Sequence, residues 1–418
     1  MFAVLNMGGI FVRVISNFVC GLDVHKKSIT ACVLLPNQKH IQTFGTMTDD
    51  LLLLIDWIRS HNCTHVAMES TGVYWKPIYN LLELEPDIEA YVVNAQHIKQ
   101  VPGRKTDVKD AEWIAELLKH GLLKPSYIPT REQRELRELV RYRRSLIDEK
   151  ARESNRIQKV LEGANIKLGS VASDVLGVSG RAIIRELIKG NTEPTKLAEM
   201  SKGKLRKKIE LLEQSLNGLI GPHQRFMLKK QMEHIEFLEE HISELDQEIK
   251  ERTSPYEEDI RYMDSIPGIG RQTAEQLLAE VGPDMSRFPT ANHLTSWAGM
   301  APGQNESAGK KRPARTRKGN KHLRSALIEA ANSIIRKRDS YLQAKYHRIK
   351  RRRGSKKAAV AIARQLLVIV YHLLTRKEQY QELGSGYYKN QAIEIKKNKA
   401  LKSLRKLGYE VVLSPQTA

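Results

Sequence analysis

The 418-residue sequence predicts an α/β domain at the amino terminus and mainly helical structure in the rest of the chain. From Phe18 to about Ile128, short β-rich runs alternate with amphipathic helical patterns, which is the order typical of an α/β sheet. From Thr130 onward the composition turns helical. The length suggests two or three domains and is ample for buried cores.

The elements of the first domain are predicted from their apolar patterns and flanking residues. An apolar run at 18–25 enters a hairpin, and Pro36 with Asn37 marks the turn between the next two strands. Thr48 to Asp50 is expected to cap the first helix. Three early strands followed by strand–helix alternation predict an RNase H-like α/β fold. The predicted strands are 18–25, Ile29–Leu35, His40–Phe44, His65–Glu69 and Ile88–Asn94, and the predicted helices are Leu51–Arg59, Val73–Glu83 and Asp107–His120.

Two long helices are predicted in the middle of the chain. The first runs from Thr130 to about Leu161, and the second spans Phe226–Glu251, where apolar residues recur every three to four positions. This sustained spacing, with charged residues at many other positions, predicts a coiled-coil pair or a bundle arm. A helix packed on its own domain is the alternative. Residues 165–225 contain several glycines and are predicted as shorter helices and turns.

The predicted domain limits follow these changes in pattern. Residues 1–16 form an extension; its start carries no positive charge and Gly8 and Gly9 interrupt the apolar run, which argues against a signal peptide. No later run is predicted to be long and apolar enough to span a bilayer, and three cysteines without disulfide or zinc spacing fit a reducing cytoplasm. The other parts are an RNase H-like domain at 17–128, a helical coiled-coil region at 129–260, a mainly α carboxyl-terminal domain at 261–376 and a basic tail at 377–418.

The net charge of +21 is concentrated in one segment. Between Lys310 and Lys357 there are 19 Lys and Arg but only two acids, Glu329 and Asp339, so a net +17 falls there. A solvated face usually interleaves acids, and the segment lacks the aromatic-rich apolar side of a membrane-surface helix. We therefore predict a polyanionic partner and no membrane.

Four acids stand in the order and setting of a metal-dependent nuclease. Asp23 lies in the first strand and Glu69 ends a later one, whereas Asp107 and Asp110 project from one face of a predicted helix. Carboxylates brought together in this way repel one another unless a cation lies between them. Oxygen ligands without a nearby Cys and His cluster favour Mg²⁺ or Mn²⁺ over zinc. As the alternatives, Asp107 alone can cap its helix and Asp110 can serve the helix dipole.

Gly-rich and basic segments are candidates for contacts with nucleic acid. Ser265–Gly270, followed by Thr273–Glu280, resembles a helix-hairpin-helix turn whose free N–H groups can meet a phosphate, although a plain inter-helix turn fits nearly as well. Arg104 and Lys105 place positive charge beside the acids. The candidate contact residues are Arg104, Lys105, Gly268, Gly270, Lys310, Lys311, Arg312, Arg315, Arg317, Lys318, Arg324, Arg351, Arg352 and Arg353.

A hydroxyl stands in the most distinctive basic loop. Ser307 lies in the Gly-rich stretch Ala298–Gly309, and three cations follow directly at 310–312. Such a hydroxyl is well placed to meet a phosphate, and composition alone favours a loop hydrogen bond over a nucleophile. No His or Asp base follows in a triad-like pattern, which disfavours acyl transfer.

At these residues the sequence resembles the DEDD-type insertion-sequence transposases of the IS-one-ten family, the bridge-RNA-guided recombinases. The shared order of motifs spans roughly residues 18–335 and is far more specific than any one motif. Residues 1–16 are not part of the family pattern, and Ala308 separates Ser307 from the following glycine. The matching segments are Gly21–His25, Met68–Gly72, Lys105–Ala111, Ser265–Gly270 and Glu306–Gly309 with its basic continuation.

The resemblance implies a transposase, a recombinase that cuts and rejoins donor and target DNA. The first domain would be RuvC-like, with its four acids holding Mg²⁺ or Mn²⁺, and Ser307 would attack the scissile phosphate to form a covalent 5′-phosphoserine link to DNA. The implied site is composite, with the acids of one subunit acting with the serine of another in a dimer or tetramer. An element-encoded guide (bridge) RNA would choose the sequences, in the cytoplasm of a prokaryote beside its nucleoid.

Two other functions fit parts of the sequence. A RuvC-like endonuclease, such as a junction resolvase, would use water as the nucleophile and leave Ser307 as a DNA contact. Such an enzyme needs neither the serine loop nor the second domain. A non-catalytic nucleic-acid-binding protein would keep full activity in cells when Asp23 or Glu69 is replaced by Ala.

Overall fold

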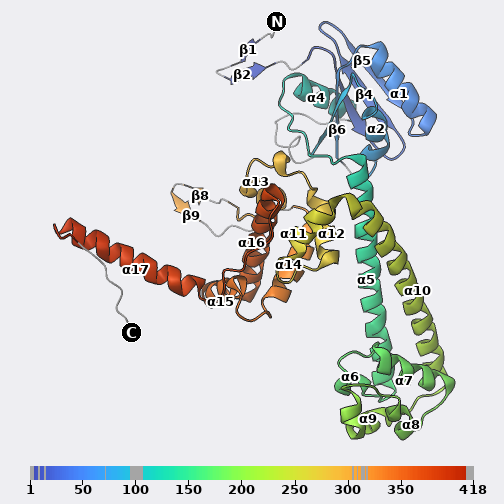
Figure 1. The fold of residues 1–418 in the computed structure, drawn as a ribbon. Coiled ribbons are helices and arrows are strands. Elements are labelled where there is room, and N and C mark those ends of the chain that lie inside the picture. The colour runs from blue at the N-terminus through green and yellow to red at the C-terminus, as the bar shows by residue number, and fades with distance from the viewer. Residues whose placement is uncertain are drawn as a thin grey trace. The chain divides into compact units, whose positions relative to one another are not determined.

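The computed structural model describes residues 4–7, 10–13, 16–70, 72–94, 107–303, 306–307, 309–311, 316 and 319–410. Within these ranges side chains are described except at 4–7, 10–13, 107–109, 306–307, 310–311, 389–390 and 392. The chain divides into two compact units, Met1–Pro129 and Thr130–Ala418, whose elements are labelled in Figure 1.

The first unit is built on a five-stranded mixed sheet with the order β5-β4-β3-β6-β7. Strands β3, β4 and β5 pair antiparallel in chain order, whereas β3, β6 and β7 run parallel. Three antiparallel strands followed by two parallel ones fit the RNase H-like fold predicted from the sequence. The strands are β3 (Val19–Val24), β4 (Ile29–Leu34), β5 (Lys39–Phe44), β6 (His65–Glu69) and β7 (Glu89–Val93).

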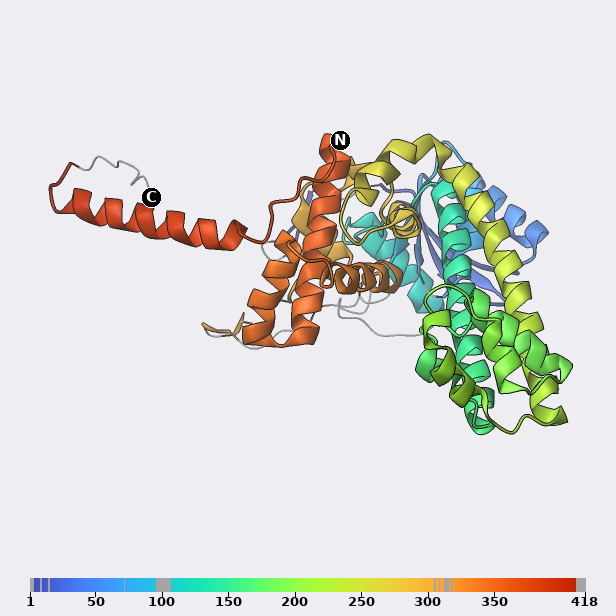
Figure 2. The same cartoon turned by 60° about the horizontal axis from the view of Figure 1, so that its bottom comes forward.

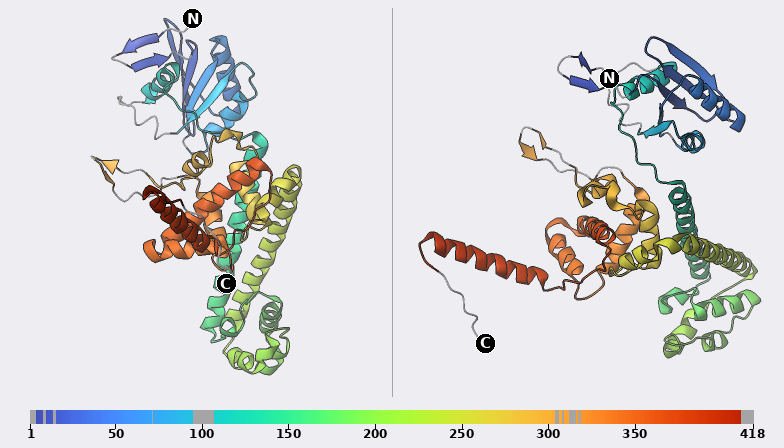
Figure 3. Two further views of the ribbon diagram at one scale, coloured as in Figure 1. Left: turned by 60° about the vertical axis from the view of Figure 1, so that its left-hand side comes forward. Right: turned by 45° about the horizontal axis from the view of Figure 1, so that its top comes forward.

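Helices cover both faces of this sheet. α1 (Thr48–Ser60) and α2 (Trp75–Leu82) pack on the face that carries Leu22, and α4 (Asp107–Lys119) packs on the face that carries Val19. The left view of Figure 3 shows α1 and α4 on opposite sides of the strands. Because alternate side chains of a strand are buried on opposite faces, the strands between the helices read as continuous apolar runs.

Two details of the first unit add to the sequence prediction. Met47 is the N-cap of α1, and Asp50 Oδ2 accepts a hydrogen bond from the Met47 backbone N–H at 3.2 Å. Within the predicted capping segment Thr48 to Asp50, the Asp50 carboxylate therefore makes the capping contact, and Thr48 is the first residue of the helix. The extension at 1–16 contains a two-stranded antiparallel hairpin of β1 (Val4–Met7) and β2 (Ile10–Arg13).

The second unit begins with two long helices, α5 (Arg131–Gly163) and α10 (Pro222–Thr253), which lie side by side in Figures 1, 2 and 3. The buried residues of both helices recur at helical spacing and are mainly apolar. Ion pairs also join them, such as Lys150 with Glu239 at 2.7 Å. The two helices lie where the periodicity predicts them, and their use as a coiled-coil arm stays a prediction.

Shorter helices, named here the tip helices, connect α5 to α10. They enclose an apolar cluster with the ends of both long helices, in which Ile157, Leu187 and Ile235 are buried. A Gly-rich sequence can therefore form a small packed body, because the long helices supply part of its core. The connecting elements are α6 (Leu168–Val171), α7 (Val178–Lys189), α8 (Pro194–Glu199), η1 (Arg206–Lys208) and α9 (Ile209–Leu216).

A helical core completes the second unit, with Leu277, Leu327 and Leu366 among its fully buried residues. Arg143 of α5 is almost fully buried, and its Nη1 forms an ion pair with Glu275 Oε2 of α12 at 2.8 Å. This ion pair links the long helices to the core. The elements after α10 are η2 (Ser254–Tyr256), α11 (Glu257–Asp264), α12 (Arg271–Val281), η3 (Met285–Arg287), α13 (Ala291–Trp297), β8 (Glu306–Ser307), β9 (Lys310–Lys311), α14 (Lys321–Ile334), α15 (Tyr341–Arg353), α16 (Ser355–Arg376) and α17 (Tyr387–Lys406).

Helix α16 corrects one expectation from the sequence. It has 22 residues and a stretch apolar enough to cross a membrane by length and composition, so the expectation that no such run exists is wrong. Half of that stretch is buried inside the protein, and Ile362, Leu366 and Val370 are completely buried in the helical core. A core helix of a globular unit has the same apolar composition, because burial on several sides selects it.

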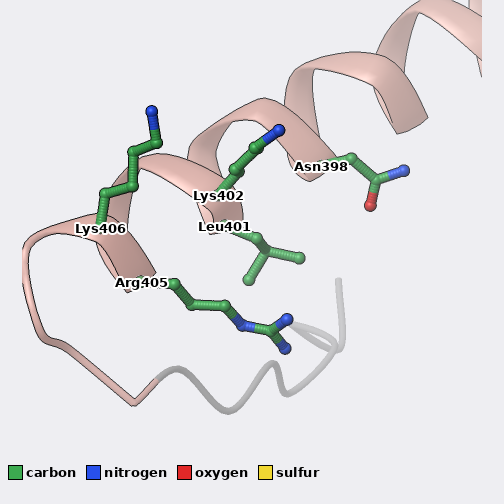
Figure 4. Close-up of a pocket in the computed structure, with 5 residues that line it drawn as sticks. All are labelled: Asn398, Leu401, Lys402, Arg405 and Lys406. Atoms are coloured by element: carbon green, nitrogen blue, oxygen red, sulfur yellow. The ribbon is translucent and has the colours of Figure 1, made fainter.

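Helix α17 lies in the basic tail and packs on α15 through aromatic contacts. The Tyr388 ring stacks on Tyr341 with centroids 5.3 Å apart, and the Arg348 guanidinium lies 4.6 Å from the centre of the Tyr388 ring. A hollow of about 530 Å³ lies along the end of α17, and Figure 4 draws its lining side chains as sticks. Its lining contains no acid and no hydroxyl, so this hollow lacks the groups of a phosphoryl-transfer site. The lining residues are Asn398, Leu401, Lys402, Arg405 and Lys406.

Candidate active site

Two of the four predicted acids lie at neighbouring strand ends in the first unit. The parallel register of β3 and β6 pairs Leu22 with Met68, so Asp23 and Glu69 come next to each other. Asp23 follows Gly21 by two residues and Glu69 follows Ala67 by two, which puts both on the face covered by α4. Parallel pairing therefore brings together two carboxylates that are 46 positions apart in the sequence.

The Asp23 side chain is held in a partly buried position. Only 15% of it is exposed, and its Oδ2 lies 3.0 Å from Nε2 of His25. A carboxylate with a hydrogen-bonded neighbour tolerates loss of water better than an isolated one. His25 thus orients Asp23, a role that the sequence prediction did not assign. The signal was available, because Asp23 and His25 are two residues apart at a strand end.

Gly21 explains how the helix that carries the other two acids approaches the sheet. A Cβ atom at Gly21 would lie 2.2 Å from the Ala111 carbonyl oxygen and 2.5 Å from the Ala115 nitrogen of α4. Only glycine allows this close packing of strand and helix. Asp110, which precedes Ala111, is half-buried, and Asp107 is the first residue of α4. The helix that packs on the Asp23 face therefore begins with the two remaining acids.

The donor groups at this place match Mg²⁺ or Mn²⁺ in kind, because carboxylate oxygens are the ligands these ions prefer. Among the side chains that the structure describes, no three acids, histidines or cysteines form a group that could hold an ion. The Asp107 side chain lies outside the described atoms, as do Arg104 and Lys105 in full. The complete set of four acids is therefore a prediction that rests on the strand register and the packing of α4.

Ser307 lies in a short hairpin of the second unit. Its Cα is paired with that of Lys310 between β8 and β9, and Gly309 adopts a φ of +71° in the turn. An isolated bridge between Pro302 and Thr316 closes the hairpin further out. The Ser307, Lys310 and Lys311 side chains are not described, and Arg312, Arg315, Arg317 and Lys318 lie outside the described residues.

The base of the Ser307 hairpin is tightly built. A Cβ atom at Gly319 would lie 2.4 Å from the Gly299 nitrogen, so the two ends of the loop meet where no side chain fits. Arg324 of α14 donates from Nη1 to the Gly299 carbonyl at 3.1 Å and to Thr316 Oγ1 at 2.9 Å. This guanidinium group holds the loop ends together, and its predicted contact with nucleic acid stays a prediction.

A buried carboxylate anchors the same loop to α5. Glu280 of α12 is fully buried, and Arg141 of α5 donates to it through two nitrogens at 2.7 and 2.8 Å. Asn320 Nδ2 donates to Glu280 Oε2 at 2.6 Å, while Asn320 Oδ1 accepts from the backbone N–H groups of His322 and Leu323 to cap α14. Asn320 therefore fixes the end of the loop and the start of α14 together.

Burial would raise the pKa of Glu280, but hydrogen bonds from Arg141 and Asn320 and the nearby charges of Arg141 and Arg137 lower it below its ordinary value of 4.5. Burial also lowers the pKa of Arg137 to about 10. The carboxylate is therefore charged at neutral pH. Its stabilising effect is present above pH 4.5 and is lost as the pH falls through the lowered pKa.

We expect Glu280→Gln to lower the free energy of unfolding at pH 7 by about 2–4 kcal/mol, because the partly buried Arg137 and Arg141 lose their counter-charge. Urea denaturation at pH 7 and below pH 4 measures the free energy of unfolding. The difference in this free energy between wild type and variant should be smaller at the lower pH. The control is Glu329→Gln, since Glu329 forms an exposed bidentate pair with Arg144 and should cost about 1 kcal/mol or less. Equal losses for the two variants would contradict the anchoring role.

The predicted helix-hairpin-helix turn lies between α11 and α12. Gly268 has a φ of +86°, and a Cβ atom there would lie 2.6 Å from the Ile334 Cγ1 atom of α14. Gly270 is the N-cap of α12, with open space around its Cα. Close packing on α14 explains why a glycine stands at position 268. The open surroundings of Gly270 leave room for the predicted phosphate contact.

The basic end of α15 is exposed. Arg351, Arg352 and Arg353 form its last turn, where positive charge also favours the helix dipole. Gly354, with a φ of +82°, then turns the chain into α16. These three arginines are open to a polyanion, as the charge pattern of the sequence predicts.

Two protein-family models match the chain. A DEDD-type IS110 model, described as "Transposase", matches residues 20–166, and the model "Transposase IS116/IS110/IS902 family" matches residues 260–347. The first match contains the four predicted acids, and the second contains Ser307 and the Asn320–Glu280 contact.

Curated relatives agree with these matches. The chain is 26% identical to the transposase for insertion sequence element IS1111A of Coxiella burnetii over 303 residues, which is 70% of this chain and 73% of that protein. It is 25% identical to the pilin gene-inverting protein of Moraxella bovis over 370 residues, or 87% of this chain and 97% of that protein. A shorter match of 36% over 116 residues is to the uncharacterized 43.6 kDa protein of insertion element IS110 in Streptomyces coelicolor, covering 26% of this chain and 27% of the relative.

Proposed function

The chain belongs to the IS110 family of transposases, and we propose that it cuts and rejoins donor and target DNA through a covalent serine intermediate under the guidance of an RNA. Relatives named as a transposase and as a gene-inverting protein support a DNA-processing enzyme. Such a protein works where the DNA is, which places it with the nucleoid in the cytoplasm of a prokaryote.

The observation that carries the proposal is the placement of Asp23 and Glu69 side by side on the face covered by α4. We assign these two acids, with Asp107 and Asp110, to hold Mg²⁺ or Mn²⁺. Ions bound there would make a hydroxyl a better nucleophile and offset the charge that develops on the leaving oxygen. His25 keeps the Asp23 carboxylate oriented, and the partial burial of Asp23 limits competition from water.

Ser307 is assigned as the nucleophile. Its Oγ forms a bond to the scissile phosphorus, the bond from phosphorus to the 3′ oxygen breaks, and the serine proton ends on that oxygen. The products are a 5′-phosphoserine link and a free 3′-hydroxyl, so the energy of the phosphodiester is kept. A 3′-hydroxyl of the partner strand then reverses the step, which joins the strands and releases the serine.

The basic residues are assigned to hold nucleic-acid backbones, while pairing with an element-encoded RNA chooses the sequence. The family resemblance implies a composite site, and we assign that site to a homodimer or tetramer. In that assembly Ser307 of one subunit would act with the acids of another.

The first test asks whether both the ion and the RNA are needed. With purified protein, the element RNA and both DNAs, we expect joined product in the presence of Mg²⁺ and none after chelation with EDTA. Omitting the RNA should also remove the product, yet leave salt-dependent DNA binding intact, because backbone contacts need no base pairing. Product is measured by sequencing across the new junctions.

Three results separate this proposal from its rivals. Junctions that form without RNA would refute the guide, and junctions that form in EDTA would refute the metal site. Cut DNA with free 5′ ends and no protein attached would favour the resolvase that uses water.

A further inference from the structure

The tip helices carry a strongly basic segment that has no part in the site described above. Five cations fall between Ser201 and Lys208, and no acid occurs between Glu199 and Glu210. All five side chains are exposed. They are Lys202, Lys204, Arg206, Lys207 and Lys208.

These cations differ from their neighbours in forming no ion pair with any residue that the structure describes. Elsewhere in the tip, Arg181 pairs with Glu239 at 2.5 Å, Lys189 with Glu186 at 2.7 Å and Lys196 with Glu193 at 2.6 Å. Within the described part of the chain, none of the five cations of 201–208 forms an ion pair. The segment therefore keeps its positive charge available to an outside partner.

Three of the lysines line an open pocket of about 570 Å³ beside α7. The segment is fixed there, because the Lys202 backbone N–H donates to Ser179 Oγ at 2.9 Å. One acid, Asp174, also lines the pocket, and its Oδ1 already accepts a hydrogen bond from the Leu176 N–H at 2.9 Å. The lining residues that bear polar side chains are Ser173, Asp174, Ser179, Lys202, Lys204 and Lys208.

We propose that this basic face, formed by residues 201–208 and the pocket beside α7, is an additional DNA-binding surface that holds the phosphates of duplex DNA without reading its sequence. Charge complementarity identifies a polyanion. The pocket lining has no aromatic side chain on which an unpaired base could stack, which favours the backbone of a duplex over single-stranded nucleic acid. The proposal rests on the proposed function only in taking DNA as the partner, and it is independent of the serine chemistry.

The test measures DNA affinity across salt concentrations with the full-length protein. The variant carries Lys202→Gln, Lys204→Gln and Lys208→Gln, and the probe is a duplex of about 40 base pairs without an element sequence. Each lost phosphate contact lowers the slope of log affinity against log salt by about 0.9, so we expect a decrease of about 2–3. The ratio of the DNA affinity of the wild type to that of the variant should then fall roughly 40-fold between 50 and 200 mM salt.

A matched control removes the same charge from exposed lysines of the long helices, with Lys159→Gln, Lys229→Gln and Lys250→Gln. This control should change the slope by less than about one unit. Thermal melting checks that both variants are folded. Equal slopes for the two variants would overturn the proposal, and so would a loss of binding to structured RNA with no change for duplex DNA.

The result is separable from the proposed chemistry. Binding can weaken in the tip variant while the covalent adduct still forms at saturating DNA, and that combination supports both proposals. Weakened binding with no adduct even in the wild type would retain the DNA-binding surface and refute the serine mechanism.

Discussion

Replacing Ser307 by Ala is expected to abolish the covalent protein–DNA adduct and to reduce recombination at least about a thousandfold. Alanine has no oxygen to bond to phosphorus, and the loss of a nucleophile is not compensated by groups that only bind or orient the DNA. Affinity for DNA should change little, because the basic residues around the loop supply the backbone contacts. The measurement is a denaturing gel of labelled DNA, on which the adduct migrates with the protein.

The control for this substitution is Ser333→Ala, which removes an exposed hydroxyl from α14 in the same unit. It should leave adduct formation unchanged. Both variants should melt at the wild-type temperature, since Arg324 and Asn320 hold the hairpin base without the serine side chain. An adduct that persists in Ser307→Ala, or cleavage at the wild-type rate without one, would contradict the assignment.

The sheet of the first unit was predictable because its strands are short apolar runs between clear turn signals. The strand His65–Glu69 matches the sequence prediction residue for residue, and the other four strands of the sheet agree with it to within one residue at each end. Helix α16 was missed by this reasoning, because no run was predicted to be long and apolar enough to span a bilayer and this 22-residue helix is. Periodicity and composition measure how apolar a helix is, and they cannot tell whether protein or lipid covers it. The packing of Ile362 and Leu366 in the core answers that question only in the folded chain.

The sequence singles out the acids of the candidate site, but it does not indicate the residues that support the site. Asp23 and Glu69 stand out because acids are costly in apolar strands, which is a local signal. The anchor of the Ser307 hairpin has no such signal, since Arg141, Glu280 and Asn320 come from three separate segments. Charge counting placed Arg324 with the nucleic-acid contacts, whereas its guanidinium contacts Gly299 and Thr316 inside the protein.

Loss of the first-unit acids should disable the enzyme in a different way from loss of the serine. We expect Asp23→Asn and Glu69→Gln each to reduce cleavage about a thousandfold or more while DNA binding is kept. Neither variant should be less stable without metal, because removing one of two neighbouring negative charges relieves their repulsion. This expectation separates a metal site from a structural ion pair, whose disruption would lower stability.

Metal-dependent stability provides a measurement that does not depend on activity. An ion that binds only the folded protein raises the free energy of unfolding, by about 2.7 kcal/mol at a concentration of 100 times its Kd. The melting temperature of the wild type should therefore rise with added Mn²⁺ or Mg²⁺. This rise should be lost in Asp23→Asn and in Glu69→Gln. The control, Asp49→Asn, removes an exposed charge from α1 in the same unit and should keep the full rise. An equal rise in melting temperature in all four proteins would mean that these carboxylates hold no ion. The proposal that the acids bind the metal while the serine acts as the nucleophile would then be wrong.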